Sequence, residues 1–281
     1  MARRLTPDIS PPRRQGRQET RGSFIRMSPL ASLAPWRSIS QASRDEVSLV
    51  TCQPAIARHT PRVRVLITAG PTREPLDPVR FLTNRSSGKM GYALAHAFIH
   101  AGHSVLLISG PTELDVPDLV DYIPVETAAD MHEAVGHMLE RVEIAVFAAA
   151  VADYTPAVVS AQKLKKSDAS MTLELVRTPD ILGAARGQFG FTGTLVGFAA
   201  ETENLETNAR DKLVRKRCDL IVANDVSKPG IGFDSDENEV LLVFPTQTTA
   251  LPQASKHELA HQLVEQILLL HIDRQTAAQP N

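Results

Sequence analysis

From residue 62 onward the chain alternates short apolar runs with helical patterns, and this alternation constrains the possible fold more than any other feature. The predicted strands are Val63–Thr68, Ser104–Ser109, Asp121–Val125, Ile144–Ala149, Leu195–Ala199 and Leu220–Ala223. The predicted helices are Gly88–Ala101, Ala128–Arg141, Pro179–Gly187, Asn204–Arg217 and Lys256–His271. Continuously apolar strands suit a sheet that helices cover on both faces. We therefore predict an α/β fold with a doubly wound, mostly parallel, Rossmann-like sheet.

Two segments depart from this alternation. Residues 155–177 combine Pro156, a lysine-rich run and the strand-like stretch Met171–Val176, and they predict a flap excursion beside the sheet. Residues 239–244 predict a late strand before the final helix.

The first sixty residues differ in composition from the rest of the chain. They hold ten arginines and four acids, a net charge of +6, and are rich in Pro and Ser without a sustained period. We expect residues 1–60 to be a disordered or mis-called N-terminal tail, with Met27 as one candidate start; a transit peptide is the alternative, weakened by the acids. Residues 61–273 form the predicted domain, and residues 274–281 a C-terminal tail.

Charge and hydropathy exclude several function classes. Residues 61–281 carry 20 basic and 28 acidic residues, a net charge of −8, which argues against nucleic acid as a partner. No apolar run reaches the roughly 18 residues needed to span a bilayer, so we expect no membrane partner. Cys52 and Cys218 form no metal-spaced or redox motif, and a cytoplasmic location is expected.

A glycine-rich junction follows the first predicted strand. Thr68–Thr72 and Asn84–Gly91 form a strand–turn–helix pattern of the kind that binds phosphorylated ligands in α/β folds. A polar loop separates the two glycine groups, so the pattern predicts something larger than a pyrophosphate cradle. A P-loop is excluded, because Thr83 and Met90 stand where Gly and Ser or Thr are needed. Ser86 and Ser87 are alternative N-caps, and an ordinary capped helix is the other interpretation.

Polar residues follow three other strands, where open α/β sheets bind ligands. Asp153 follows Ile144–Ala149, and polar groups also end the next two strands. In the helix Pro179–Gly187, Thr178 is a plausible N-cap and Pro179 takes the first position. Basic residues occur as a flap cluster and as a pair on one helix face: Lys163, Lys165 and Lys166, and Lys212 and Lys216.

Two other functions are alternatives to an enzyme that acts on a phosphorylated substrate. A short-chain NAD(P)-dependent oxidoreductase would need an acid after the strand Ser104–Ser109 and a Tyr followed four residues later by Lys, and the chain has neither. A non-catalytic nucleotide-binding module is the second alternative.

Eight segments taken together resemble bacterial phosphopantothenoylcysteine synthetase, from about residue 62 to residue 270. They are Thr68–Thr72, Asp77–Arg80, Asn84–Gly91, Ala149–Tyr154, Lys163–Lys166, Thr178–Ile181, Gly197–Thr202 and Ala223–Val226. The resemblance implies a ligase of coenzyme A biosynthesis. CTP would activate 4′-phosphopantothenate as an acyl-cytidylate, and the amine of L-cysteine would then displace CMP. It also implies Mg²⁺, CTP as co-substrate, and a homodimer in which the flap closes the site.

The resemblance implies roles for individual residues. Asn84 and Lys163 would be catalytic. CTP contacts would be Phe147, Ala148, Ala149, Asp153, Lys163, Thr178, Pro179, Asp180, Ile181, Phe198, Lys212 and Lys216. Substrate contacts would be Asn84, Ser86, Ser87, Gly88 and Ala150. The position of Asp153 at the end of a strand makes it a candidate metal ligand, with a local turn or helix cap as the alternative. Thr178 and Phe147 stand where the family often has Asn and Gly.

The chain departs from the bifunctional members of the family, in which a flavin-dependent decarboxylase precedes this domain. We expect a monofunctional synthetase without flavin, with a separate phosphopantothenoylcysteine decarboxylase in the pathway. A flavin spectrum of the purified chain would contradict this.

Overall fold

The computed structural model describes residues 61–166, 170–227 and 235–278, so the predictions for residues 1–60 lie outside it. Its centre is an eight-stranded sheet with the order β12-β11-β10-β9-β6-β1-β4-β5. β1 (Arg64–Ala69), β4 (Ser104–Ser109), β5 (Val120–Pro124), β6 (Ile144–Phe147), β9 (Thr194–Glu201) and β10 (Leu220–Asp225) are parallel. β11 (Glu237–Val243) and β12 (Thr248–Ser255) extend the sheet antiparallel. The predicted doubly wound, mostly parallel sheet is confirmed.

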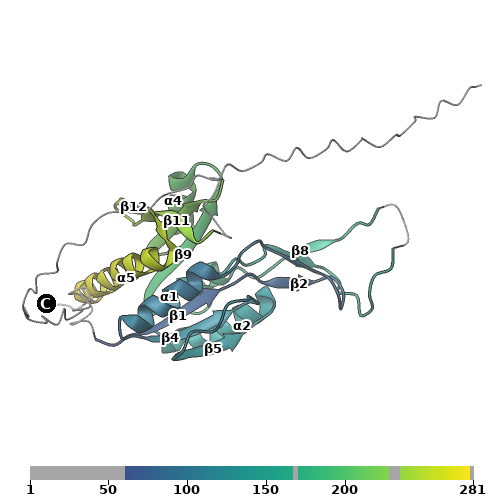
Figure 1. Ribbon diagram of the computed structural model, residues 1–281, viewed down its shortest axis with the longest axis horizontal. Coiled ribbons are helices and arrows are strands. Elements are labelled where there is room, and N and C mark those ends of the chain that lie inside the picture. Colours follow the sequence, from purple (N-terminus) through teal and green to yellow (C-terminus); the bar gives the residue numbers. More distant parts are fainter. Residues whose placement is uncertain (1–60, 167–169, 228–234, 279–281) are drawn as a thin grey trace, which may run out of the picture. The chain divides into compact units, whose positions relative to one another are not determined.

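Helices cover both faces of this sheet, as the apolar strands require (Figure 1). α1 (Lys89–His100) and α5 (Lys256–Ala278) lie side by side on one face. α2 (Ala128–Met138), with the 3₁₀ turn Leu139–Arg141, α3 (Ile181–Gly187) and α4 (Leu205–Lys216) cover the other. The central strands β1, β6 and β10 are almost completely buried, whereas the edge strands β5 and β12 are largely exposed.

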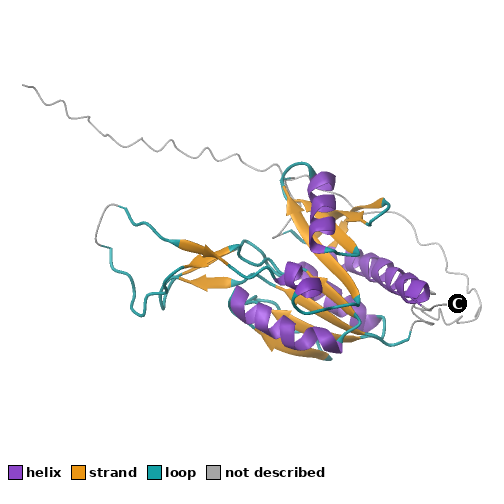
Figure 2. Cartoon of the chain, turned by 180° about the vertical axis from the view of Figure 1, so that it is seen from behind, coloured by secondary structure: helices purple, strands orange, loops and turns teal. Residues whose placement is uncertain are grey.

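Two short antiparallel pairs lie beyond the carboxyl ends of the parallel strands. β2 (Arg73–Pro75) pairs with β3 (Phe81–Thr83), and β7 (Tyr154–Pro156) pairs with β8 (Leu175–Arg177). Figure 2 shows the two pairs side by side beyond the sheet. The flap, residues 157–174, joins β7 to β8, so the predicted excursion is present.

The two glycine groups of the junction meet in space although Gly70 and Gly88 are 18 positions apart in the sequence. A Cβ on Gly88 would lie 3.2 Å from the Cα of Gly70, and both residues have positive φ, 70° and 79°. Gly91 packs α1 against β1, since a Cβ there would lie 2.6 Å from the Cβ of Ala69. The β2–β3 hairpin is thus an insertion within an otherwise tight strand–turn–helix junction.

Three local predictions at helix ends are wrong. Gly88, in the left-handed conformation, is the N-cap of α1; Ser86 Oγ instead accepts a hydrogen bond from Gly88 N at 3.3 Å. α3 begins at Ile181 with Asp180 as its N-cap, not at Pro179 with Thr178. α5 continues seven residues beyond the predicted end at His271.

Candidate active site

A cavity of about 500 Å³ opens at the carboxyl ends of β6 and β9, between α3 and α4. Open α/β sheets bind ligands at this edge, beside the point where the strand order reverses. Here the reversal lies between β1 and β6, because the chain passes from β1 to β4 on one side and later to β6 on the other. The cavity is large enough for a nucleotide-sized ligand.

Ten of the twelve residues that the resemblance gives as CTP contacts line this cavity. They are Phe147, Ala149, Asp153, Thr178, Pro179, Asp180, Ile181, Phe198, Lys212 and Lys216. Ala148 and Lys163 are not among the lining residues. The structure therefore brings together residues from four separate segments of the chain, and their CTP-binding role stays a prediction.

The floor of the cavity is the loop that leaves β6, and β1 together with the turn after it fixes the backbone of this loop. Ala148 N donates to Thr68 O at 3.1 Å, and Ala149 N donates to Thr68 Oγ1 at 3.3 Å. Further along, Ala152 N donates to Thr72 Oγ1 at 3.0 Å. Small side chains at 148–150 leave this part of the backbone accessible, so a flat ligand could lie against it.

α4 supplies a positive wall. Lys212 Nζ donates to Phe198 O at 2.7 Å, and burial lowers the pKa of this lysine while the nearby Glu201 carboxylate opposes that shift. Lys216 forms an ion pair with Asp180, and the exposed Arg215 also lines the cavity. Three cationic side chains in one wall suit a polyphosphate.

Asp180 joins the wall to α3. Its Oδ1 accepts from Gly183 N at 2.9 Å, which caps the helix, while Oδ2 accepts from Lys216 Nζ. Burial opposes ionisation of this carboxyl, but Lys216 and the Gly183 N–H together keep its pKa below the usual value. Thr178, the wrongly predicted cap, instead donates from Oγ1 to Ala152 O at 2.6 Å and so ties the end of β8 to the floor.

Asp153 lies where the floor meets β7. Its side chain is exposed and lines the cavity, and its carbonyl oxygen accepts from Thr178 N at 3.1 Å. Asp180, the other carboxylate that lines the cavity, is paired with Lys216, so Asp153 is the carboxylate suited to Mg²⁺, which is usually held by one or two carboxylates together with substrate phosphates. The described residues contain no group of three or more His, Cys, Asp or Glu suited to hold a metal ion.

Asn84 lies at the base of the β2–β3 hairpin, next to the floor of the cavity. Its Nδ2 donates to Ala150 O at 3.0 Å and to Val151 O at 3.1 Å. Both amide hydrogens are thereby used, so Oδ1 is left to accept from a ligand. The neighbouring predicted substrate contacts Ser86, Ser87 and Gly88 lie on the same loop into α1.

Lys163 is placed differently. It is exposed on the flap, and its neighbour Leu164 contacts Asp77 at the tip of the β2–β3 hairpin, whereas Asn84 lies at the base. The two predicted catalytic residues therefore lie at opposite ends of one hairpin and do not share the cavity.

Seven further residues line the cavity and were missed by the sequence analysis: Thr68, Met131, Val151, Tyr154, Arg177, Leu182 and Arg215. Arg215 lies one residue before Lys216, and Arg177 one residue before Thr178. Because each arginine is charged and adjacent to a predicted CTP contact, the sequence could have indicated both as candidate site residues. Thr68, Val151 and Tyr154 lie in the singled-out segments Thr68–Thr72 and Ala149–Tyr154, but no contact was assigned to them. Met131 looks like an ordinary core residue in sequence, and only the fold brings it to the cavity.

Comparison with known proteins identifies close relatives of the described region. Residues 61–270 match the family model of the DNA/pantothenate metabolism flavoprotein C-terminal domain. The Coenzyme A biosynthesis bifunctional protein CoaBC of Bacillus subtilis (strain 168) is 51% identical over 208 residues, which cover 73% of this chain and 51% of that protein. The Escherichia coli (strain K12) protein of the same name is 42% identical over 222 residues, with coverage of 76% and 55%. The chain thus spans about half the length of these relatives.

Solved structures agree with this comparison. The crystal structure of the C-terminal domain of CoaBC has a TM-score of 0.64 and 42% identity, and the match covers 75% of this chain and 96% of that domain. The DNA/pantothenate metabolism flavoprotein of Streptococcus pneumoniae has a TM-score of 0.65 at 24% identity, with coverage of 74% and 100%, which shows the shared fold alone. Among the helices of the described residues, none has the length and apolar character to cross a membrane.

Proposed function

Because this chain belongs to the family of DNA/pantothenate metabolism flavoprotein C-terminal domains, we propose that it is a phosphopantothenate–cysteine ligase. It would join 4′-phosphopantothenate to L-cysteine in coenzyme A biosynthesis, at the expense of CTP. Its similarity to the C-terminal domain of CoaBC, 96% of which is covered, supports the assignment. The observation that carries the proposal is the cavity, where the floor after β6, the α3 cap and the α4 cations form one nucleotide-sized site.

The first half-reaction is a nucleotidyl transfer. A carboxylate oxygen of phosphopantothenate attacks the α-phosphorus of CTP, an acyl–phosphate bond forms, and pyrophosphate leaves. Catalysis of this step consists mainly of positioning and neutralising the phosphates. Lys212 and Lys216 supply fixed charge for this, since the backbone carbonyl of Phe198 and the carboxylate of Asp180 hold their ammonium groups in place. When bound, Mg²⁺ would neutralise phosphate charge next to Asp153.

The second half-reaction forms the amide. The cysteine nitrogen attacks the acyl carbon, the bond to the cytidylate oxygen breaks, CMP leaves, and the nitrogen loses a proton. Asn84 is suited to this step because its amide cannot compete as a nucleophile and its Oδ1 can accept from an N–H or O–H of the ligand.

A homodimer is the assembly that the surface supports. Large apolar side chains are exposed on the two short strand pairs and on the start of the flap: Val79, Phe81, Val158, Val159, Leu175 and Val176. Val158 is 82% exposed and Val79 59%. Apolar side chains gathered in one region mark a protein–protein contact more often than solvated surface. The family resemblance indicates a second copy of this chain as the partner.

Pyrophosphate release tests the proposal. Purified protein is incubated with CTP, phosphopantothenate and Mg²⁺, with and without cysteine, and CMP and the amide product are followed by mass spectrometry. We expect pyrophosphate release to stall near one equivalent without cysteine and to continue with it. Absence of release under both conditions would refute the ligase. Turnover with ATP but not CTP would refute the choice of nucleotide.

A further inference from the structure

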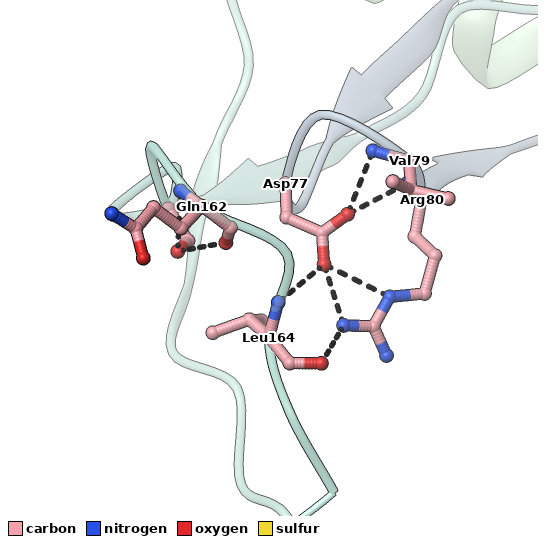
Figure 3. A network of polar contacts seen from close by, with 6 residues as sticks. Asp77, Val79, Arg80, Gln162 and Leu164 are labelled. Carbon is pink, nitrogen blue, oxygen red and sulfur yellow. Dashed lines mark hydrogen bonds and ion pairs between the residues drawn. The ribbon is translucent and has the colours of Figure 1, made fainter.

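The root of the flap is held by a buried carboxylate at the tip of the β2–β3 hairpin (Figure 3). The side chain of Asp77 is completely buried. Its Oδ1 accepts from Val79 N at 2.8 Å and from Arg80 N at 2.9 Å, which closes the hairpin turn. Its Oδ2 accepts from Leu164 N at 3.0 Å, across 87 residues of sequence, and from Arg80 Nε at 3.0 Å.

Arg80 completes the attachment by binding the carbonyl oxygen of Leu164. Its Nη2 donates to Asp77 Oδ2 at 2.5 Å and to Leu164 O at 2.8 Å. Both backbone polar groups of Leu164 are therefore bound by the hairpin tip. We call these contacts of Asp77 and Arg80 with Leu164 the flap clamp. A guanidinium that bridges a carboxylate and a carbonyl fixes orientation as well as distance.

A second contact fixes the chain on the other side of Lys163. Ser160 N donates to Leu76 O at 3.0 Å, and Ser160 Oγ donates to Gln162 O at 2.6 Å. Lys163 therefore lies between two segments whose backbones the hairpin holds. Its own side chain is exposed, so the hairpin fixes its backbone position and leaves its ammonium group accessible.

We propose that Asp77 is a positioning residue that places Lys163 for nucleotidyl transfer, through the backbone of Leu164. The inference rests on the proposed function, because it takes Lys163 as a residue that acts on the phosphates. Asp77 itself would touch neither substrate. Its carboxylate stays ionised at neutral pH, because the guanidinium of Arg80 and three backbone N–H donors hold its pKa well below the usual range.

The substitution Asp77→Asn changes only the half of the side chain that faces the flap. Asn Oδ1 can still accept from Val79 N and Arg80 N and keep the turn. Its NH₂ would face the Leu164 N–H and the Arg80 guanidinium, which are both donors, so the flap clamp would open. Asp118→Asn is the matched control, because it makes the same change on an exposed loop away from the hairpin.

Limited trypsin cleavage of the full-length protein measures the clamp without reference to any reaction. Trypsin cuts the bond between Lys163 and Leu164, and the clamp holds both polar groups of Leu164. With fragments identified by mass spectrometry, we expect cleavage there to be slow in the wild type relative to the bond between Lys165 and Lys166. Asp77→Asn should accelerate it about tenfold or more, whereas Asp118→Asn should leave it unchanged. Equal rates in wild type and Asp77→Asn would overturn the proposal.

Kinetics then separate positioning from general loss of structure. A misplacement of about 1 Å can cost on the order of 100-fold in rate. We expect Asp77→Asn to lower kcat for pyrophosphate release at least about tenfold, with the KM for cysteine within about twofold of wild type. Because Asp77 acts through Lys163, the double variant Asp77→Asn/Lys163→Gln should have the kcat of Lys163→Gln alone. Additive losses would overturn the inference even if the ligase activity is confirmed.

A second variant guards against misfolding. Arg80→Lys keeps the positive charge but cannot bridge Asp77 and Leu164 O with a planar fork. It should therefore accelerate the same cleavage while the thermal midpoint stays close to wild type. Should the wild type prove inactive as a ligase, the proposed function fails, and the cleavage comparison still decides whether the clamp exists. If Asp77→Asn and Arg80→Lys are both cleaved at the wild-type rate, the flap clamp does not exist.

Discussion

At the scale of single residues, the orientation of Asn84 carries the strongest consequence. Its NH₂ donates to two backbone carbonyls of the floor, Ala150 O and Val151 O. In Asn84→Asp a carboxylate oxygen would face these two carbonyls, and the repulsion would turn the side chain out of place. We expect kcat for amide formation to fall by about 100-fold or more, while the initial release of pyrophosphate persists. Rapid-quench measurement of both products checks this, and equal loss of the two steps would contradict it.

Lys212 illustrates a conflict between function and stability. Burial lowers its pKa, so in the fold its charged form is disfavoured relative to the unfolded chain. That cost is fully present below the folded pKa and is relieved as pH rises towards the unfolded value. We expect Lys212→Met to raise the thermal midpoint at pH 7 by roughly 2–4 °C and to lower kcat/KM for CTP at least about tenfold. Scanning calorimetry at pH 7 and pH 10 checks the sign, since the gain should shrink at pH 10.

At the scale of elements, α3 depends on Asp180 for its cap and α4 depends on it for its ion pair. Asp180→Asn keeps an oxygen for Gly183 N but removes the charge that fixes Lys216, whereas Asp180→Ala removes both. Loss of a cap costs about 1 kcal/mol, so Asp180→Ala should lower the thermal midpoint by roughly 2–4 °C and Asp180→Asn by much less. Both should raise the KM for CTP. Calorimetry and initial rates separate the two effects, and equal destabilisation by both variants would exclude the capping role.

Elements with a long apolar signal could be predicted from the sequence. β4 has the predicted bounds, and β1, β6, β9 and β10 differ by a few residues at their ends, since burial on both faces leaves an unbroken apolar run. The three-residue strands β2, β3 and β7 could not be predicted, because so short a pair has no period and two of them contain proline. β12 has no buried residue and contains Pro252, so it too lacks the apolar pattern that predicts a strand.

The length of α5 was missed for a different reason. Beyond His271 its sequence is mainly polar, and the apolar period that predicts a helix ends there. In the structure polar contacts replace apolar packing: Arg274 forms an ion pair with Asp219, and Gln275 lies 2.8 Å from His271 Nε2. Asp219 also accepts from Arg186 on α3 and from Leu195 N on β9, so it joins three elements. Tertiary partners of this kind leave no local pattern in sequence.

The candidate site likewise contains residues that could be predicted from the sequence and contacts that could not. The Asp153, Lys212 and Lys216 positions could be predicted because charged residues at strand ends and on one helix face stand out from their surroundings. The flap clamp could not, because Asp77 and Leu164 are 87 residues apart and the contact on Leu164 is to its backbone. Any residue type can offer a backbone N–H or C=O at that position, so the side-chain pattern of the sequence does not predict this contact.

At the scale of the whole molecule, the exposed apolar side chains of the hairpins predict association. We expect light scattering to give twice the mass of one chain at micromolar concentration. Val158→Asp should shift the protein towards the monomer, because a carboxylate would be buried without a partner in the contact. Val214→Asp, on the solvent side of α4 and 69% exposed, is the control and should leave the mass unchanged. A monomeric wild type would refute the assembly.

The β2–β3 hairpin connects the two residues that we propose for the two half-reactions. Asn84, at the base of the hairpin, is the residue proposed for the breakdown of the acyl-cytidylate. The tip of the hairpin holds the flap beside Lys163, the residue proposed for the formation of the acyl-cytidylate. The antiparallel pairing of β2 with β3 joins the two ends, so we expect a displacement of one end to shift the other. Under the proposed function, a substitution at either end of the hairpin is therefore expected to change the rates of both half-reactions.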